Sequence, residues 1–269
     1  MKIRLAYQLY SARDDVQADL YKTLKAVKEI GYEGVEFAGL YDHPAKEVRA
    51  MLDEIGLTAV SGHISLDLIR GNMFEMISDY KTLGCPWLAL SHLDPVNRPG
   101  GIGFPYALQT LYRFGYLCRQ AGIQFLYHNH GFELDTEISG MNGLDFLLRA
   151  VPRELMKAEL DTGWILESGC DPAAYIRKYD QDCPVVHLKD YVGSRKAEDN
   201  DPFHYCAVGH GKQDLASVLS AGLISGTEWF VVEQDFSDEN TPLEDAALSC
   251  EAVRKVPLFK LMGSAVRLS

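Results

Sequence analysis

The sequence lacks the motifs that define several common classes of protein. Its six cysteines include no pair at C-x-x-C spacing, which excludes a zinc ribbon or a thioredoxin-type redox motif. The Gly-His-Gly at 209–211 and the Gly-Ile-Gly at 101–103 lack the further glycines, or the Lys-Ser/Thr, of a dinucleotide- or phosphate-binding loop. There is no G-x-S-x-G motif, so a serine-type hydrolase is unsupported.

Long apolar stretches and an excess of basic residues are missing too. No run of about 20 apolar residues could span a membrane, and no apolar run of signal-peptide length precedes Arg13. Lys and Arg number 26 against 38 Asp and Glu, a net charge of −12, whereas nucleic-acid-binding surfaces are normally basic. The cysteines of a chain this long favour reduced thiols. We therefore expect a soluble, cytoplasmic protein that binds neither nucleic acid nor membrane.

The chain does contain a regular alternation of short apolar runs and longer amphipathic segments. A glycine follows four of the helical segments, at Gly31, Gly56, Gly84 and Gly122, where a left-handed residue would end a helix. Alternating strands and helices predict parallel strands, and eight such units favour a closed (β/α)8 TIM barrel over an open sheet. We expect one α/β domain over residues 1–269. The eight runs are residues 3–9, 34–38, 58–63, 87–92, 123–130, 157–161, 185–189 and 229–234.

Polar residues are concentrated where these predicted strands end. In a barrel of this type the active site is built at the carboxyl ends of the strands. Five of the eight histidines lie there, and three strands carry two ionisable residues at a spacing of two, which places both on one face. The pairs are His128 with His130, Glu159 with Asp161, and His187 with Lys189.

Ionisable pairs on buried strands need either partners or a metal ion. Three pairs on neighbouring strands favour a metal centre, and a metal-free histidine network is the alternative. Imidazole and carboxylate groups without cysteine suit Mn²⁺, Zn²⁺, Co²⁺ or Fe²⁺ better than Ca²⁺. The expected ligands, one from each of the last four strands, are His128, Asp161, His187 and Glu233.

Several strings together resemble the xylose isomerase-like TIM barrels, and in particular the sugar phosphate isomerase/epimerase family. They are YQLYSARD, GYEGVEFAGLY, LDEIGLTAVSGH, YHNHGFE, LDTGW, VVHLKD, VGHGKQD and VVEQD, in that order along the chain. The resemblance implies a divalent metal held by Glu, Asp, His and Glu from the fifth to eighth strands. Asp161, His187 and Glu233 match the second to fourth of these ligands, and His128 stands where the family often has the first Glu.

Two more positions depart from the family pattern. His210 stands where the family often has Glu, and Trp164 where several members have His. In epimerases of the family the first and fourth carboxylates are the two acid/base groups. A metal-bound His128 is a poor proton acceptor, so the resemblance does not carry that symmetric mechanism to this chain.

The remaining candidates have alternative roles. Glu233 is expected to be a ligand, the base or both, or else a barrel-core carboxylate paired with Lys189. His130 is the other candidate base, or it only holds a ligand. Lys189 would stabilise an enolate oxygen, or pair with Asp190 or Glu159. Glu36 and His63 would face substrate or support the ligands, Trp164 would stack on a sugar ring or close the core, and His210 would face substrate from a flexible loop. His43, His92 and His204 are assigned mostly to structure or surface.

We therefore expect a metal-dependent isomerase or epimerase that acts on a sugar or keto-sugar through an enediolate. The alternative is a lyase or dehydratase acting on a keto-sugar, keto-inositol or keto-glycoside. An apurinic endonuclease fits the acidic charge and the sparse ligand set less well, and a non-catalytic sugar-binding barrel would bind no metal. Related barrels often form dimers or tetramers, so a homo-oligomer is also compatible with the sequence.

Overall fold

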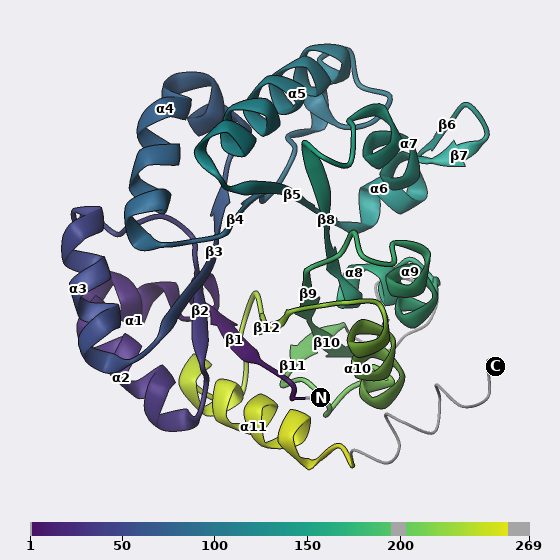
Figure 1. The fold of residues 1–269 in the computed structure, drawn as a ribbon. Helices are drawn as coiled ribbons and strands as arrows, with labels where there is room; N and C mark the ends of the chain where they lie inside the picture. Colours follow the sequence, from purple (N-terminus) through teal and green to yellow (C-terminus); the bar gives the residue numbers. More distant parts are fainter. Residues whose placement is uncertain (1, 195–202, 258–269) are drawn as a thin grey trace.

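A closed barrel of eight parallel strands forms the centre of the protein, as the sequence predicted (Figure 1). The computed structural model describes residues 2–194 and 203–257, so parts of the predicted 1–269 range lie outside it. Around the barrel the strands follow the order β1, β12, β9, β8, β5, β4, β3, β2. Their bounds are β1 Leu5–Gln8, β2 Gly34–Phe37, β3 Thr58–Ile64, β4 Trp87–Leu90, β5 Gln124–His128, β8 Met156–Asp161, β9 Val185–Leu188 and β12 Trp229–Val232.

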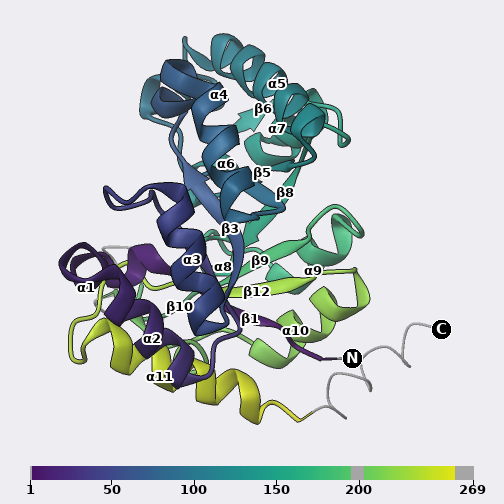
Figure 2. The ribbon, with the colours of Figure 1, turned by 60° about the vertical axis from the view of Figure 1, so that its left-hand side comes forward.

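Helices cover the outside of the barrel, and neighbours such as α2, α3 and α11 pack side by side there (Figure 2). The predicted glycines end four of them: Gly31, Gly56, Gly84 and Gly122 have φ of 115°, 77°, 81° and 80°, which glycine adopts without a steric penalty. The helices are α1 Arg13–Ala18, α2 Leu20–Ile30, α3 Ala45–Ile55, α4 Leu66–Leu83, α5 Phe104–Ala121, α6 Gly131–Asp135, α7 Gly143–Ala150, α8 Thr162–Glu167, α9 Pro172–Lys178, α10 Leu215–Ile224 and α11 Pro242–Lys255.

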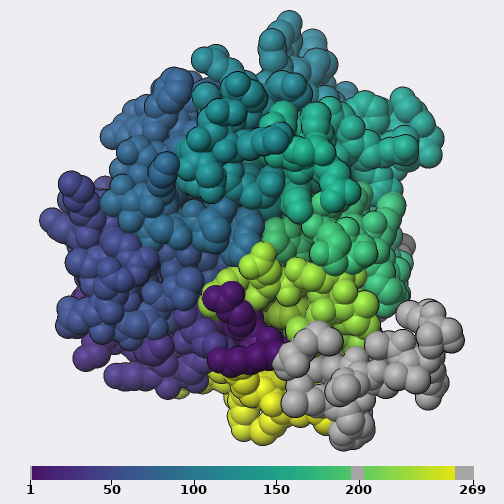
Figure 3. Space-filling model, viewed as in Figure 1, coloured from purple at the N-terminus to yellow at the C-terminus, as the bar shows by residue number. Residues whose placement is uncertain are grey.

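A small apolar cluster fills the barrel beneath its polar end. It includes Leu126, Val185 and Val231, and each of these precedes a polar side chain by two positions on its own strand or just beyond it. Residues two apart share a face of a strand, so His128, His187 and Glu233 also point into the barrel, nearer its carboxyl end. Side chains close the centre of the ring that the ribbon leaves open (Figure 3). The barrel is thus packed at one end and polar at the other.

The strands are shorter than the apolar runs at several ends. The run 123–130 was expected to be strand throughout, but β5 stops at His128 and His130 is the residue before α6. The run 185–189 also divides, because the chain leaves the barrel after Leu188 and forms a hairpin of β10 Asp190–Val192 with β11 His204–Cys206. A second small hairpin pairs β6 Glu137–Ile138 with β7 Met141–Asn142.

The described helices include none that is both long and apolar enough to cross a membrane.

Candidate metal centre and active site

A cavity of about 690 Å³ opens at the carboxyl ends of the barrel strands. Its walls combine several histidines with aromatic side chains and three charged groups, which is the mixture expected of a site for a small polar molecule. The lining residues are Tyr10, Ala38, Gly39, His63, Leu68, Ser91, His92, His128, His130, Trp164, Lys189, Tyr205, Glu233, Asp235 and Phe236.

The four predicted ligands lie close together: His128 and Glu233 line this cavity, whereas Asp161 and His187 are fully buried and do not reach its lining. His128, Asp161, His187 and Glu233 each place one ligand atom within 4.8 Å of the others, and all four are buried. His128 Nε2 is 3.6 Å from Asp161 Oδ2, and His187 Nδ1 is 3.1 Å from Glu233 Oε2. Asp161 Oδ2 accepts no hydrogen bond from the described residues, although the Lys189 ammonium lies 3.1 Å from it. A buried acceptor beside imidazole and carboxylate groups fits a divalent transition metal.

The Lys189 ammonium adds a positive charge to this group. Its Nζ is 3.1 Å from Asp161 Oδ2, 3.1 Å from Glu233 Oε2 and 3.2 Å from Asp235 Oδ1. Within the described residues these are its ion pairs: the Glu233 partner was one alternative from the sequence, whereas Asp190 and Glu159, the other partners considered, do not pair with it. Burial alone would lower the pKa of Lys189, but the three carboxylates raise it well above its usual value.

The negative partner Glu233 is held in its charged form. Burial opposes this charge, but Lys189 and His187 outweigh it and lower the pKa of Glu233 well below its usual value. Asp235, which follows two residues later, was not identified from the sequence. Its spacing of two from Glu233 is the same signal that identified the other pairs.

A second group of polar residues lies deeper in the barrel. Glu36 is fully buried and accepts hydrogen bonds from Gln8 and Ser61, and its Oε2 is 3.1 Å from His63 Nε2. Glu159 lies beside it with its Oε1 2.6 Å from His63 Nε2. Glu36 therefore lies beneath the cavity, whereas His63 reaches its wall.

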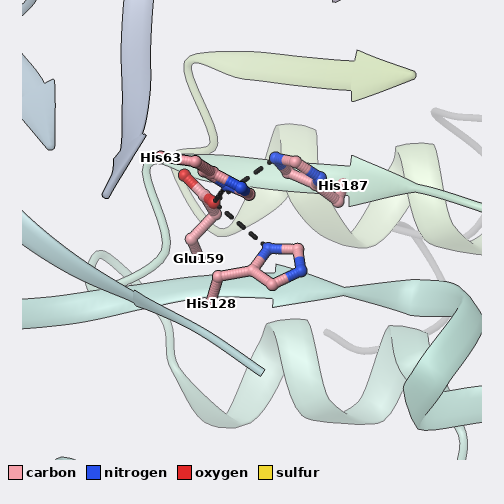
Figure 4. Close-up of side chains that lie close together, drawn as sticks. All are labelled: His63, His128, Glu159 and His187. Atoms are coloured by element: carbon pink, nitrogen blue, oxygen red, sulfur yellow. Dashed lines mark hydrogen bonds and ion pairs between the residues drawn. The ribbon is translucent and has the colours of Figure 1, made fainter. Parts of the chain in front are cut away.

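The two carboxyl groups of this deeper layer differ in pKa. Burial alone would raise the pKa of Glu36, but the stronger combined effect of His63 and His187 lowers it to about 2. Burial, and after it the negative Glu36, raises the pKa of Glu159 to about 7. His63, His128, Glu159 and His187 form a second group whose ligand atoms lie within 4.8 Å of one another (Figure 4). Glu159 was paired with Asp161 in the sequence but was not assigned a site role.

The comparisons with known proteins agree with this architecture. A family model for xylose isomerase-like TIM barrels matches residues 24–255. The chain belongs to that family. Two solved structures share the fold: a sugar phosphate isomerase/epimerase from Parabacteroides distasonis (18% identical, TM-score 0.77, covering 96% of both chains) and the IolI protein with a bound zinc atom (15% identical, TM-score 0.69, covering 96% of this chain and 98% of that one).

A curated relative with a more specific name matches only part of the chain. An inosose dehydratase from Geobacillus kaustophilus strain HTA426 is 24% identical over 191 residues. The match covers 63% of this xylose isomerase-like barrel and 61% of the relative, so the chain spans less than two thirds of that protein.

Aromatic rings form one wall of the cavity in this xylose isomerase-like barrel. The ring of His130 is 5.3 Å from that of His128 and 5.4 Å from that of Trp164, between centroids. His92, assigned to structure or surface from the sequence, instead lines the cavity and meets His130 edge-on at 4.9 Å. Burial, then the charges of Lys189 and His92, lowers the pKa of His130 well below its usual value. The signal for His92 was its place just after a strand.

His210 lies away from this cavity. It lines a second cavity of about 400 Å³, which shares Tyr205 with the first. The loop around it is fixed from below, because the backbone N–H groups of Gly209 and Gly211 each donate to the buried Asp190 carboxylate at 3.0 Å. The return of the chain through the β10–β11 hairpin therefore separates His210 from the predicted ligands.

Proposed function

We propose that this chain is a metal-dependent enzyme that enolises a sugar or keto-sugar and so acts as an isomerase or epimerase. The observation that carries the proposal is the convergence of His128, Asp161, His187 and Glu233, the first and last of which line one cavity. A divalent ion such as Mn²⁺, Zn²⁺, Co²⁺ or Fe²⁺ held there would polarise a substrate carbonyl and its adjacent hydroxyl. The zinc in the IolI structure, which shares this fold, supports the choice of metal class.

The chain's own residues supply the charge and proton chemistry. The ammonium of Lys189 lines the cavity and stays positive, so it stabilises the oxygen on which negative charge develops when the α-proton leaves. His130 has an unprotonated ring at neutral pH because its pKa is lowered. Its Nδ1 makes no hydrogen bond within the described parts of the chain, and an imidazole in this state accepts a proton.

Glu233 and His130 differ as bases. Both groups have a lowered pKa, but the Glu233 carboxylate is committed to ion pairs with Lys189 and His187, whereas Nδ1 of the His130 ring makes no hydrogen bond in the described structure. We therefore assign proton removal to His130. The charged Glu233 would orient the substrate hydroxyl and, if it moves a proton, would do so from the opposite side of the barrel mouth.

A lyase reaction is the second candidate, and a specific observation favours it. The Geobacillus relative is an inosose dehydratase, and dehydration of a keto-sugar begins with the same α-proton. His130 would take that proton, the C–H electrons would form the enolate, and their return would expel the β-hydroxyl as water once an acid has protonated it. Position 128 is a histidine, so the chain lacks the second acid/base carboxylate of a symmetric epimerisation. An asymmetric elimination is therefore chemically simpler.

Proton exchange in D₂O tests the proposal directly. Purified protein with measured metal content is incubated with a panel of ketoses, aldoses and keto-inositols, and deuterium uptake and products are followed by NMR. We expect exchange at the carbon next to a carbonyl, with an isomer, an epimer or an unsaturated product. His187→Ala should abolish it, and His43→Ala, a half-exposed histidine outside the cavity, should not. A metal-loaded protein that exchanges no proton in any compound would refute the proposal.

A further inference from the structure

Glu159 has no part in the proposed chemistry, yet it makes some of the shortest polar contacts in the barrel. Its side chain is fully buried. Its Oε1 lies 2.6 Å from His63 Nε2, 3.2 Å from His128 Nδ1 and 3.3 Å from His187 Nε2 (Figure 4). One carboxylate oxygen therefore faces three imidazole rings, two of which are expected metal ligands.

The two nitrogens of the His128 ring face different groups. Nδ1 faces Glu159, while Nε2 points to Asp161 Oδ2 at 3.6 Å. A neutral imidazole has a hydrogen on one nitrogen and a lone pair on the other, and the partner of the N–H decides which is which. A carboxylate that accepts Nδ1–H leaves the lone pair on Nε2, on the side of the metal site.

We propose that Glu159 is a positioning residue of the metal centre, which fixes the tautomer and orientation of His128 so that Nε2 is the ligand atom. The inference rests on the proposed function, because it needs a metal at the four predicted ligands. It also explains a departure from the family pattern. A glutamate at position 128 would offer either oxygen as a ligand and has no tautomer to fix, whereas a histidine there needs an acceptor behind it.

The contact lengths favour this role over a second metal ion in the deeper group. Two ligand atoms on one tetrahedral zinc, each about 2.0–2.1 Å from the ion, stand about 3.3 Å apart. The separation of 2.6 Å between Glu159 Oε1 and His63 Nε2 is a hydrogen-bond length instead. His63 therefore holds the Glu159 carboxylate from the far side, and its ring stacks on that of His187 with centroids 5.1 Å apart.

Metal affinity measured by competition with a chromogenic chelator tests the inference without any substrate. Glu159→Gln keeps the shape but weakens the acceptor, and we expect Zn²⁺ or Mn²⁺ binding to weaken about 10- to 100-fold, as is typical when the partner of a ligand histidine is removed. Glu133→Gln is the matched control, because Glu133 is equally buried and contacts the backbone of His130 rather than a ligand ring. It should leave the affinity unchanged.

The weakening of metal binding should disappear or reverse in a second background. In His128→Glu protein a carboxylate stands where the ring was, and Glu159 would repel it, so adding Glu159→Gln should leave metal binding unchanged or tighten it. An equal weakening in both backgrounds would overturn the inference. So would a wild-type stoichiometry of two ions of which Glu159→Gln loses one, because Glu159 would then be a ligand.

The wild-type protein offers an independent readout if the variants do not fold. Nitrogen-15 NMR of the histidine rings should show His128 protonated at Nδ1 and bound to metal through Nε2, and binding through Nδ1 would refute the inference. The outcomes also separate this inference from the proposed function. A wild-type protein that binds no metal refutes both, whereas one whose metal affinity ignores Glu159 refutes only the positioning role.

Discussion

Replacing Lys189 by methionine should destabilise the metal-free protein and tighten its binding of a divalent cation. The Lys189 ammonium is buried, and three carboxylate contacts of 3.1–3.2 Å surround it. At an effective dielectric constant of about 20, each contact contributes about 5 kcal/mol of attraction, much of which offsets the cost of burying the charge. Removing one member of such a buried group typically costs about 3–5 kcal/mol, because the other charges stay behind.

A bound cation changes that cost. Asp161 and Glu233 would then have a second positive partner, so the metal-loaded variant should lose less stability than the metal-free one. By thermodynamic linkage the same difference appears as tighter metal binding, about tenfold for each 1.4 kcal/mol. In a chain of this size the metal-free melting temperature should fall by roughly 10 °C.

Thermal unfolding with excess chelator and with saturating metal measures both effects. Lys157→Met is the control: Lys157 also lies on a barrel strand, but its side chain is 25% exposed and pairs with Asp182 at 3.3 Å. It should cost less than about 1 kcal/mol, whether metal is present or not. Equal losses in the two variants, or weaker metal binding by Lys189→Met, would refute the reasoning.

Three further predictions concern stability. Burial raises the pKa of Glu133 from 4.5 to about 8, so the folded protein favours the protonated carboxyl. The free energy of unfolding should therefore fall as the pH rises from about 4.5 through 8. Urea unfolding should show a smaller fall in Glu133→Gln, and parallel pH profiles of the two proteins would contradict this. Gly163→Ala should cost about 1–3 kcal/mol in thermal unfolding, because the new Cβ would lie 2.8 Å from Lys189 Cβ. Gly71→Ala is the control: its Cβ would meet nothing within 4 Å, so it should be neutral or stabilising by up to about 1 kcal/mol. Asp190→Ala should cost about 2–4 kcal/mol by urea unfolding, because its buried carboxylate accepts hydrogen bonds from four backbone N–H groups. A loss below about 0.5 kcal/mol would show instead that water replaces the carboxylate.

The fold and the main cluster could be predicted because both depend on short-range patterns. The strands could be predicted from short continuous apolar runs, and the glycines after helices marked the turns into the next strand. A parallel barrel then brings the carboxyl ends of all strands to one rim. Residues far apart in sequence, such as Asp161 and Glu233, could therefore be placed together without knowledge of any contact.

Depth within the barrel and partner choice could not be predicted this way. Alternation shows that Glu159 and Asp161 share a face, but not that the first lies level with His63 from a strand across the barrel. Likewise the spacing of two gave Lys189 an inward direction without naming Asp235 as a partner. His210 was misleading for a different reason. A glycine-flanked loop suggests access to the site, but no periodic signal in the sequence indicated the β10–β11 hairpin. After that hairpin, His210 lines a neighbouring cavity.

The pairing of β1 with β12 sets the order in which the site is assembled during synthesis. Leu5 lies opposite Phe230, so the ring cannot close until the last strand has left the ribosome. Glu233 follows that strand directly, so the other three expected ligands are synthesised before it. Until then Asp161 and Lys189 have no carboxylate partner on the closing side. If a divalent ion binds at the four proposed ligands, only a chain that has completed its barrel would bind it tightly.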